Sequence, residues 1–235
     1  MGRIFGTDGA RGVANTEISC KLAMNIGRAA AMVVAQEKKR KVTFLVGKDT
    51  RISSDMLECA ITAGLCSVGA DVIQVGYVPT PAVAYLVNDL KADGGIMLSA
   101  SHNSFEYNGI KIFGGNGFKL TDEEEFEIEE IVLDHTLPYD IKWDDELGRI
   151  KQDHDAVDKY VDHIVTTVDT DLSGFKIALD CSNGSASTTA EKIFKKLNAD
   201  VTIISANPNG VNINKDCGST HIDDLSKFVR ENGFD

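Results

Sequence analysis

The sequence of 235 residues predicts an α/β fold: two consecutive α/β/α sandwich domains with mixed, mostly parallel sheets, the second of them incomplete. Short apolar runs typical of buried strands alternate with longer segments whose apolar residues recur every three or four positions, the spacing of an amphipathic helix. This alternation is lost around Pro138 and Trp143 and then resumes. We therefore expect one domain over residues 1–145 and a second over residues 153–235.

The segments of the first domain are assigned from these two patterns. Helices are expected at residues 19–36, 53–68 and 80–88. Strands are expected at residues 42–47, 70–76, 95–98 and 109–114, the last of which returns directly after a loop. Strands that alternate with helices favour a mostly parallel sheet covered on both faces.

Polar residues mark where several helices begin. Ser19, and one of Ser53 and Ser54, are the expected N-caps, because a serine hydroxyl accepts a hydrogen bond from an unpaired N–H of the first turn. Thr121 and Glu124 have the spacing of a capping box. The acidic run that continues to residue 130 is therefore expected to be a capped, solvated helix rather than a metal site.

The second domain is expected to contain two strands, at residues 174–180 and 200–204. Helices are expected at residues 153–167, 187–197 and 223–229. A further strand should follow, and Gly233-Phe234-Asp235 has the character of its approach. The second domain is therefore expected to be incomplete, and the chain to be part of a longer protein.

Composition and charge exclude several classes of partner. No stretch approaches the roughly 18 to 20 apolar residues that span a bilayer, and the amino terminus lacks the apolar core of a signal peptide. A net charge of −12 repels the phosphates of nucleic acids. The five cysteines are scattered and form no Cys-x-x-Cys pair, so neither a zinc site nor a disulfide framework is expected. We expect a cytoplasmic protein that binds neither membranes nor nucleic acid, and the sequence leaves a homodimer open.

The run from Ser99 to Lys111 carries the strongest indication of chemistry. It places a hydroxyl, an imidazole, an amide and an ammonium group at the end of a buried strand, where loops hold reactive groups on a rigid base. Ser101 is the candidate phosphoryl carrier, because its phosphorylated form would offer oxygens to Mg²⁺ and to donors from His102, Asn103 and Lys111. A polar turn without a chemical role is the alternative, which composition alone favours.

Cationic residues near this loop are further candidates. Lys111 points away from its two isoleucine neighbours, so it is either a general acid or base in a cleft or an ordinary surface lysine. Arg11 lies between glycines and could grip a phosphate, with a surface salt bridge as the alternative. Asp49 and Arg51 separate a strand from a helix, where an anion site could form, but a structural role in bracing the loop is favoured.

Together these segments resemble the α-D-phosphohexomutase family over essentially the whole chain. The resemblance is carried by residues 5–12, 47–51 and 99–111, and the last of these resembles the family's phosphoserine loop, Ser-His-Asn-Pro, with its downstream Asn-Gly-x-Lys. Residues 208–214 and 217–221 resemble the phosphoglucosamine mutase branch rather than the phosphomannomutase/phosphoglucomutase branch. Ser104 stands where the family usually has proline, so a somewhat more mobile loop is expected.

The resemblance implies a reaction and roles for four residues. Phosphorylated Ser101 would convert glucosamine 6-phosphate to a bisphosphorylated sugar and then to glucosamine 1-phosphate, a precursor for amino-sugar nucleotides and the cell wall. Lys111, helped by His102, would be the acid/base group, and Arg11 would hold phosphate. Mg²⁺ would neutralise charge, with Ser101 as one ligand through its phosphate.

The family's metal loop, sugar-recognition loop and final phosphate-binding loop are absent from this sequence. The other metal ligands would therefore lie outside it, and the chain alone is expected to be inactive. A phosphogluco- or phosphomannomutase, and a stand-alone module that binds a sugar phosphate, are the alternative functions.

Overall fold

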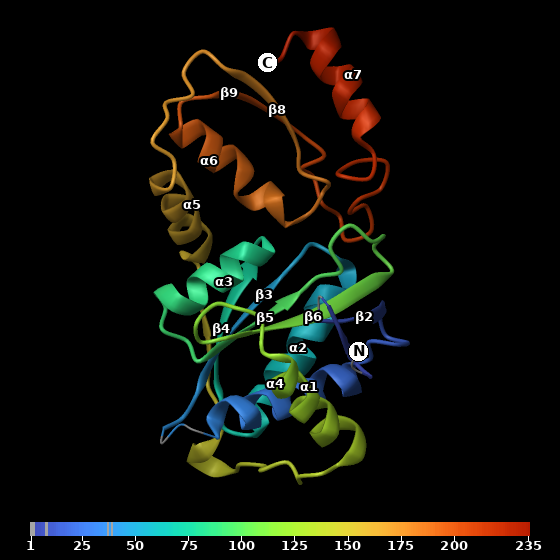
Figure 1. The fold of residues 1–235 in the computed structure, drawn as a ribbon, viewed down its shortest axis with the longest axis vertical. Helices are drawn as coiled ribbons and strands as arrows, with labels where there is room; N and C mark the ends of the chain where they lie inside the picture. Colours follow the sequence, from blue (N-terminus) through green and yellow to red (C-terminus); the bar gives the residue numbers. More distant parts are fainter. Residues whose placement is uncertain (1–2, 8, 37, 39) are drawn as a thin grey trace.

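The computed structural model describes residues 3–7, 9–36, 38 and 40–235. It contains a first unit built on a seven-stranded sheet and a second unit built on a two-stranded sheet (Figure 1). The strands of the first unit are β1 (Phe5–Gly6), β2 (Gly9–Val13), β3 (Thr43–Lys48), β4 (Asp71–Tyr77), β5 (Gly94–Leu98), β6 (Tyr107–Gly114) and β7 (Ile150–Gln152). Its helices are α1 (Cys20–Ala35), α2 (Ile52–Ser67), α3 (Thr80–Asp89) and α4 (Asp122–Glu129), the last continued by a π-helical turn, Glu130–Asp134.

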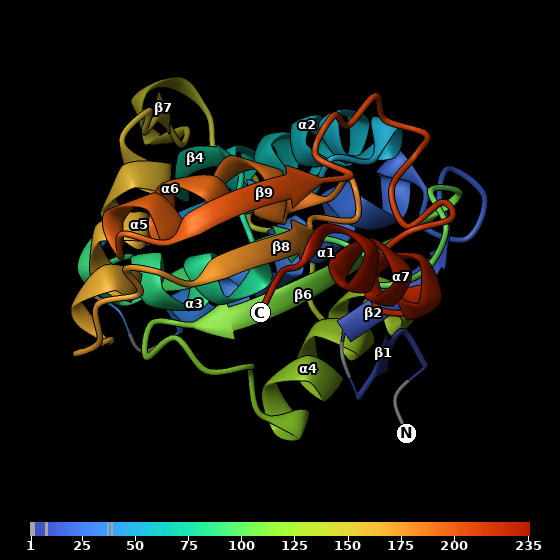
Figure 2. The ribbon, with the colours of Figure 1, turned by 90° about the horizontal axis from the view of Figure 1, so that it is seen from above.

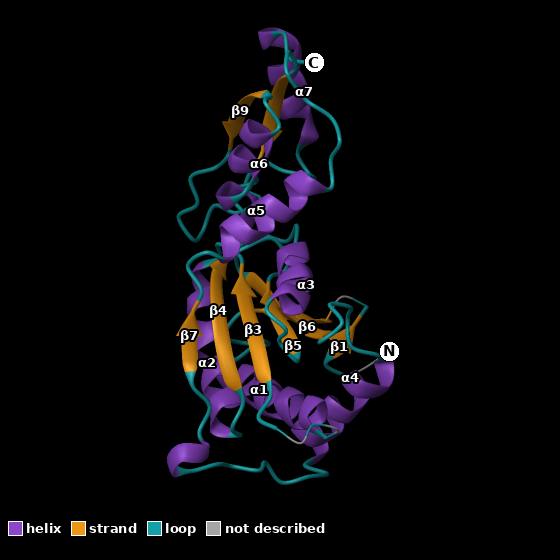
Figure 3. Cartoon of the chain, turned by 90° about the vertical axis from the view of Figure 1, so that its left-hand side faces the viewer, coloured by secondary structure: helices purple, strands orange, loops and turns teal. Residues whose placement is uncertain are grey.

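The first unit's sheet is mixed, with the strand order β1-β2-β6-β5-β3-β4-β7. Strands β5, β3, β4 and β7 are parallel, whereas β6, β2 and β1 continue the sheet in antiparallel fashion. Helices α2 and α3 make the crossovers that parallel strands require. The carboxyl ends of β3 and β4 face the second unit (Figure 3), and ligands of α/β proteins bind at this edge of the sheet.

Helices cover both faces of the sheet and form two hydrophobic cores. Helices α1, α2 and α4 pack on one face, where Phe44 and Ile96 are buried. Helices α3 and α5 (Ala156–Thr166) pack on the other face, where Leu45 and Met97 are buried. Because successive residues of a strand point to opposite faces, a strand covered on both faces is apolar at every position. This confirms the predicted α/β class.

Two of the predicted helix caps are present. The Ser19 hydroxyl accepts a hydrogen bond from the N–H of Leu22 at 3.1 Å. Thr121 and Glu124 form the capping box at the start of α4, each side chain accepting from the other's backbone N–H. Both caps depend on residues three positions apart, which is why the sequence reveals them.

The prediction that Ser53 or Ser54 caps α2 is wrong. The helix begins earlier, at Ile52, and its N-cap residue, Arg51, makes no side-chain cap bond. The N–H of Ile52 donates instead to the carbonyl oxygen of Gly210 in the second unit, at 2.9 Å. Because the residue that binds this N–H is distant in the sequence, the local sequence does not indicate where the helix begins.

The segment between the two expected domains contains a strand. β7 (Ile150–Gln152) pairs in parallel with β4, and it extends the first sheet past the expected domain end at residue 145. All three of its residues are exposed. Such a short strand at a sheet edge has neither an apolar run nor an alternating pattern, so periodicity could not reveal it.

The second unit contains the parallel pair β8 (Lys176–Asp180) and β9 (Asp200–Ile204), joined by α6 (Ala190–Lys196). Helix α7 (Ile222–Asn232) follows and lies at the end of the molecule away from the first sheet (Figure 1). Seen from above, β8, β9 and α7 lie in front of the first unit (Figure 2). Among the described residues, no helix is long and apolar enough to cross a membrane.

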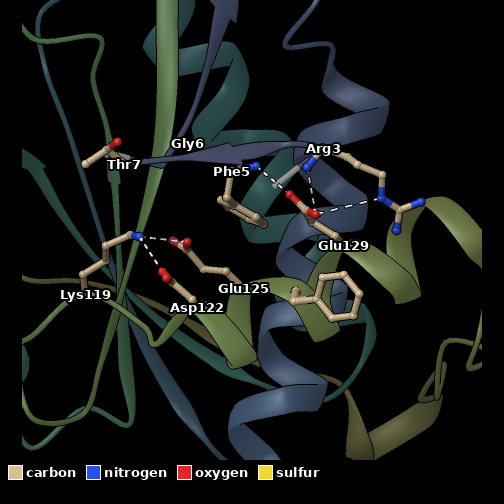
Figure 4. A pocket seen from close by; sticks show the side chains of 9 residues that line it. Arg3, Phe5, Gly6, Thr7, Lys119, Asp122, Glu125 and Glu129 are labelled. Carbon is tan, nitrogen blue, oxygen red and sulfur yellow. Dashed lines mark hydrogen bonds and ion pairs between the residues drawn. The ribbon is translucent and has the colours of Figure 1, made fainter. Parts of the chain in front are cut away.

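The acidic helix α4 is not fully solvated, contrary to expectation. Glu129 is 1 % exposed, and its carboxylate accepts hydrogen bonds of 2.6–2.9 Å from the N–H groups of Arg3, Ile4 and Phe5 (Figure 4). Glu125 is also buried and pairs with Lys119, Oε2 to Nζ, at 2.8 Å. The helix therefore binds the start of the chain to the first unit through a charged side chain. A sequence pattern of acidic residues cannot distinguish the buried ones from the exposed ones.

The pKa of Glu129 is lower than its ordinary value of 4.5. Burial raises this pKa, but the hydrogen bonds from the N–H groups of Arg3, Phe5 and Ile4, together with the charge of Arg3, outweigh that effect. A carboxylate whose pKa falls on folding stabilises the folded state above its unfolded pKa, and this stabilisation is lost as the pH falls through the folded pKa.

We expect Glu129→Gln to lower the free energy of unfolding at pH 7 by about 2 kcal/mol, because charge-assisted hydrogen bonds are lost and an amide group faces a backbone N–H. Denaturant titrations of both proteins between pH 7 and pH 3 measure this difference. It should stay constant at neutral pH and shrink as the pH falls below 4.5, the ordinary pKa of the group. Exposed Glu123→Gln is the matched control, and an equal loss in both variants would contradict the assignment.

Candidate active site

The Ser101 loop, residues 99–106, connects β5 to β6 at the sheet edge that faces the second unit. The N–H of Ser99 donates to the carbonyl oxygen of Gly109 at 3.0 Å, which closes the base of the loop. Ser101 is exposed and has a φ of +56°, a left-handed conformation that costs a non-glycine residue roughly 1–2 kcal/mol. Its N–H donates to the hydroxyl of Ser99 at 3.0 Å. The hydroxyl of Ser101 thus stands on a turn that other contacts must hold.

The buried guanidinium group of Arg51 supplies such contacts. Its Nη2 donates to the carbonyl oxygens of Ser101 at 2.8 Å and Asn103 at 3.0 Å, and its Nη1 donates to that of Ser104. Its Nε donates to Asp49 Oδ2 at 2.9 Å, and Arg51 is 1 % exposed. The loop-bracing role predicted for Asp49 and Arg51 is confirmed. The greater mobility expected at Ser104 stays a prediction.

A second layer of hydrogen bonds fixes Asp49 relative to the strands. The Ser54 hydroxyl donates to Asp49 Oδ1 at 3.0 Å. Fully buried Asn108, at the start of β6, donates through Nδ2 to the hydroxyl oxygens of Ser53 at 2.9 Å and Ser54 at 3.0 Å. Ser53 and Ser54 lie within the first turn of α2, past its N-cap position, and their hydroxyls join this network.

The second unit also contacts the Ser101 loop. Asn214 Nδ2 donates to the carbonyl oxygens of Ser101 at 2.9 Å and Asn103 at 2.8 Å, two of the three that Arg51 also binds. Beside it, the Thr50 hydroxyl donates to the carbonyl oxygen of Asn183 at 2.6 Å. Asn214 was not predicted as a site residue, because residues 208–214 indicated only a family resemblance.

Lys111 and Arg11 lie on strands next to the loop. The β5–β6 register puts Lys111 opposite Met97, and the β2–β6 register puts Arg11 opposite Gly109. Cross-strand partners share a face, so Arg11 and Lys111 lie on the same face of the sheet, and the neighbours of Lys111 are fully buried on the other. The predicted orientation of Lys111 is confirmed. His102 is exposed in the turn directly after Ser101. Roles in catalysis or phosphate binding stay predictions for all four candidate residues.

The cationic side chains of residues 47–51 are paired with other protein groups, which favours the bracing role over an anion site. The ammonium group of Lys48 contacts Glu58 at 2.5 Å and Asp55 at 2.7 Å. Burial lowers the pKa of Lys48, but the two carboxylates raise it by more than burial lowers it. The pKa of Lys48 therefore lies above its ordinary value. Lys48 is thus paired with carboxylates and Arg51 with carbonyl oxygens and Asp49, so this segment braces the sheet edge.

The described residues do not complete a magnesium site. Residues 3–7, 9–36, 38 and 40–235 contain no group of three or more His, Cys, Asp and Glu side chains that could hold a metal ion. Mg²⁺ demands near-octahedral coordination by oxygen atoms, and a phosphate on Ser101 would supply one ligand.

A pocket of about 680 Å³ lies beside β1 and α4 (Figure 4). Its lining consists of Arg3, Phe5, Gly6, Thr7, Lys119, Asp122, Glu125, Phe126 and Glu129. None of the four candidate site residues lines it. We therefore locate the candidate site at the Ser101 loop, where buried polar groups from both units converge, and not at this pocket.

Replacing Arg51 should reveal how much the Ser101 loop depends on it. We expect Arg51→Met to lower the free energy of unfolding by about 3–5 kcal/mol, because it leaves the buried carboxylate of Asp49 without its charged partner. Arg230→Met, at an exposed position in α7, should change it by less than about 0.5 kcal/mol. Urea titration followed by circular dichroism measures both, and similar stabilities for the two variants would refute the role given to Arg51.

The chain is similar to known proteins in sequence and in fold. Residues 2–138 match the family model of phosphoglucomutase/phosphomannomutase, alpha/beta/alpha domain I. The chain is 51 % identical, over all of its 235 residues and 52 % of the relative, to phosphoglucosamine mutase of Acetivibrio thermocellus. It thus spans about half the length of the curated relatives that it matches.

Solved structures share the fold. A phosphoglucomutase/phosphomannomutase family protein of Burkholderia thailandensis superposes with a TM-score of 0.83 and 26 % identity, over 99 % of this chain and 51 % of that one. Aspergillus fumigatus N-acetylphosphoglucosamine mutase, described in complex with GlcNAc-6P and magnesium, superposes with a TM-score of 0.54 over 94 % of this chain and 44 % of that one. At 12 % identity, this second likeness shows the fold alone. The chain belongs to the phosphoglucomutase/phosphomannomutase family of α-D-phosphohexomutases.

Proposed function

We propose that this chain acts as the amino-terminal half of a phosphoglucosamine mutase, in which Ser101 carries the transferred phosphoryl group. The observation that carries the proposal is the exposed hydroxyl of Ser101 on a loop whose backbone is bound by a buried arginine. Identity of 51 % to a phosphoglucosamine mutase, over the whole chain, supports the choice of sugar. Because the chain spans about half the length of such relatives, we assign the activity to a protein of their length.

The reaction consists of two phosphoryl transfers. In the first, the 1-hydroxyl of glucosamine 6-phosphate attacks phosphorus on Ser101, the serine O–P bond breaks, and glucosamine 1,6-bisphosphate forms. In the second, the Ser101 hydroxyl attacks the 6-phosphate, which releases glucosamine 1-phosphate and restores the phosphoserine. Each transfer needs a group that takes up or supplies a proton at the reacting oxygen.

The residues on the adjoining strands have suitable chemistry for these needs. Lys111, assisted by His102, is the proposed acid/base group, since both are within the β5–loop–β6 segment that carries Ser101. Arg11 shares its sheet face with Lys111 and is the proposed phosphate ligand, because a guanidinium group binds phosphate through two parallel hydrogen bonds. A positive site of this kind is needed because the chain as a whole carries a net charge of −12.

Magnesium is proposed as the cofactor of the whole enzyme. It would neutralise charge on the transferred phosphoryl group. This chain would contribute the phosphate on Ser101 as one ligand, and the remaining ligands would come from residues outside the chain. The proposal predicts that the isolated chain binds a sugar phosphate without turning it over.

The test uses a protein of the relatives' length that contains this chain. We expect Ser101→Ala to abolish the conversion of glucosamine 6-phosphate, whereas Ser104→Ala, which removes a neighbouring exposed hydroxyl, should retain most of the activity. Intact-mass and peptide analysis should find one phosphoryl group on Ser101. An active Ser101→Ala variant would overturn the proposal.

The alternative phosphoglucomutase or phosphomannomutase activity is separated by substrate. Turnover of glucosamine, glucose and mannose 6-phosphates by the same protein should be fastest for glucosamine 6-phosphate. A clear preference for mannose or glucose 6-phosphate would assign the chain to the other branch of the family.

A further inference from the structure

We propose that Asn214 is a positioning residue for phosphoryl transfer: it couples the second unit to the Ser101 loop and fixes the direction of the Ser101 hydroxyl. The inference rests on the proposed function for its catalytic consequence, but its structural part does not. Asn214 donates from one amide nitrogen to the carbonyl oxygens of Ser101 at 2.9 Å and Asn103 at 2.8 Å. These two carbonyl groups flank His102, so they set the path of the turn that presents the hydroxyl.

The Ser101 loop needs donors of this kind. Ser101 has a φ of +56°, which is unfavourable for a residue with a side chain, and its own N–H donates to a side chain of the same loop, the hydroxyl of Ser99. The N–H of Asn103 donates to the carbonyl oxygen of Ala100 at 3.2 Å, a weak turn bond. A turn of this kind keeps one conformation only if its carbonyl oxygens are bound from outside. Arg51 binds them from the first unit and Asn214 binds them from the second.

The backbone around Asn214 is itself held in place. Its N–H donates to the carbonyl oxygen of Ser182 at 2.9 Å, and its neighbour Ile213 is buried. Asn214 has a φ of +58°, a conformation that asparagine tolerates better than most residues. The Asn212 side chain closes the preceding loop by accepting from the N–H of Asn209 at 2.9 Å and donating to the carbonyl oxygen of Asn207 at 3.0 Å. The amide group of Asn214 is thus a fixed donor on the second unit.

Two consequences follow for the reaction. The amide nitrogen of Asn214 donates to two backbone oxygens of the loop, so we expect its loss to disturb the loop and not a contact with the substrate. It should instead let Ser101 sample other directions, which lowers the rate of transfer more than the affinity for the sugar phosphate. The second unit thereby contributes to a step whose reacting group belongs entirely to the first.

The chain offers well-matched variants. Asn214→Gly keeps the left-handed backbone but removes the donor, and Asn214→Asp keeps the shape but replaces the donor with a carboxylate that repels the carbonyl oxygens. Asn198→Gly is the control, because Asn198 also has a left-handed φ, of +64°, in the second unit. Its amide donates to Asp171 at 3.3 Å, away from the Ser101 loop.

Hydrogen exchange of the 235-residue chain tests the contact directly. In both Asn214 variants, the amides of residues 101–107 should exchange faster by on the order of tenfold, the factor to which the loss of one or two hydrogen bonds corresponds. In Asn198→Gly they should exchange as in the unchanged chain. Unchanged exchange in the Asn214 variants would overturn the inference, and so would equal acceleration in the loop and in β8–β9, which would show a general loss of structure.

Kinetics of a protein of the relatives' length tests the catalytic part. Asn214→Gly should lower kcat by on the order of tenfold and leave KM within about twofold, because the Asn214 amide bonds the backbone of the Ser101 loop and its loss should act through the loop. A rise in KM at constant kcat would overturn the positioning role. If Ser101→Ala remains active, the proposed function fails, whereas the exchange experiment still decides whether Asn214 holds the loop.

Discussion

The buried guanidinium group of Arg51 is the constraint on which the candidate site depends. It is 1 % exposed, and it carries a charge that must be balanced where water cannot reach it. Asp49 balances the charge, and three loop carbonyl oxygens take the remaining hydrogen bonds. The loop therefore supplies the hydrogen-bond acceptors that the buried guanidinium group requires. Any change in the loop path leaves donors of Arg51 unpaired, so the stability of the first unit and the shape of the site are linked.

The contact between the two units follows the same edge of the sheet. The N–H of Ile52 binds the carbonyl oxygen of Gly210, the Thr50 hydroxyl binds that of Asn183, and the Thr188 hydroxyl binds that of Tyr77. Each bond involves a residue at or just past the carboxyl end of a strand, or in the first turn of α2. The second unit thus packs on the carboxyl ends of the parallel strands. Its polar groups form hydrogen bonds there with polar groups that the strands do not pair.

Local patterns predicted most of the fold, and long-range contacts explain what they missed. The caps at Ser19 and Thr121 depend on neighbours three positions away, and the strands of the first sheet are apolar because helices cover both faces. In contrast, β7 was missed because its pairing with β4 is a property of the sheet and not of its three exposed residues.

The candidate site, like the fold, was predicted from the sequence only in part. The motif around Ser101 was recognised, and the bracing role of Asp49 and Arg51 followed from their place between a strand and a helix. The burial of Glu129 and the contact from Asn214 were not predicted, because each partner lies more than a hundred residues away in sequence. Glu129 lies in a run of acidic residues and Asn214 in a segment rich in asparagine, so the local sequence does not indicate which of these residues has a distant partner.

The direction of the peptide groups in the Ser101 loop has an electrostatic consequence. Carbonyl oxygens of Ser101, Asn103 and Ser104 all point at Arg51. In a trans peptide the N–H lies opposite the C=O, so the N–H groups that follow them in the chain point away from that cation. The negative ends of these dipoles face the protein interior and their positive ends face the opposite side. Although the protein as a whole is acidic, the N–H ends of these peptide groups can therefore create a potential that favours a dianion locally. No additional basic side chain is needed for this effect.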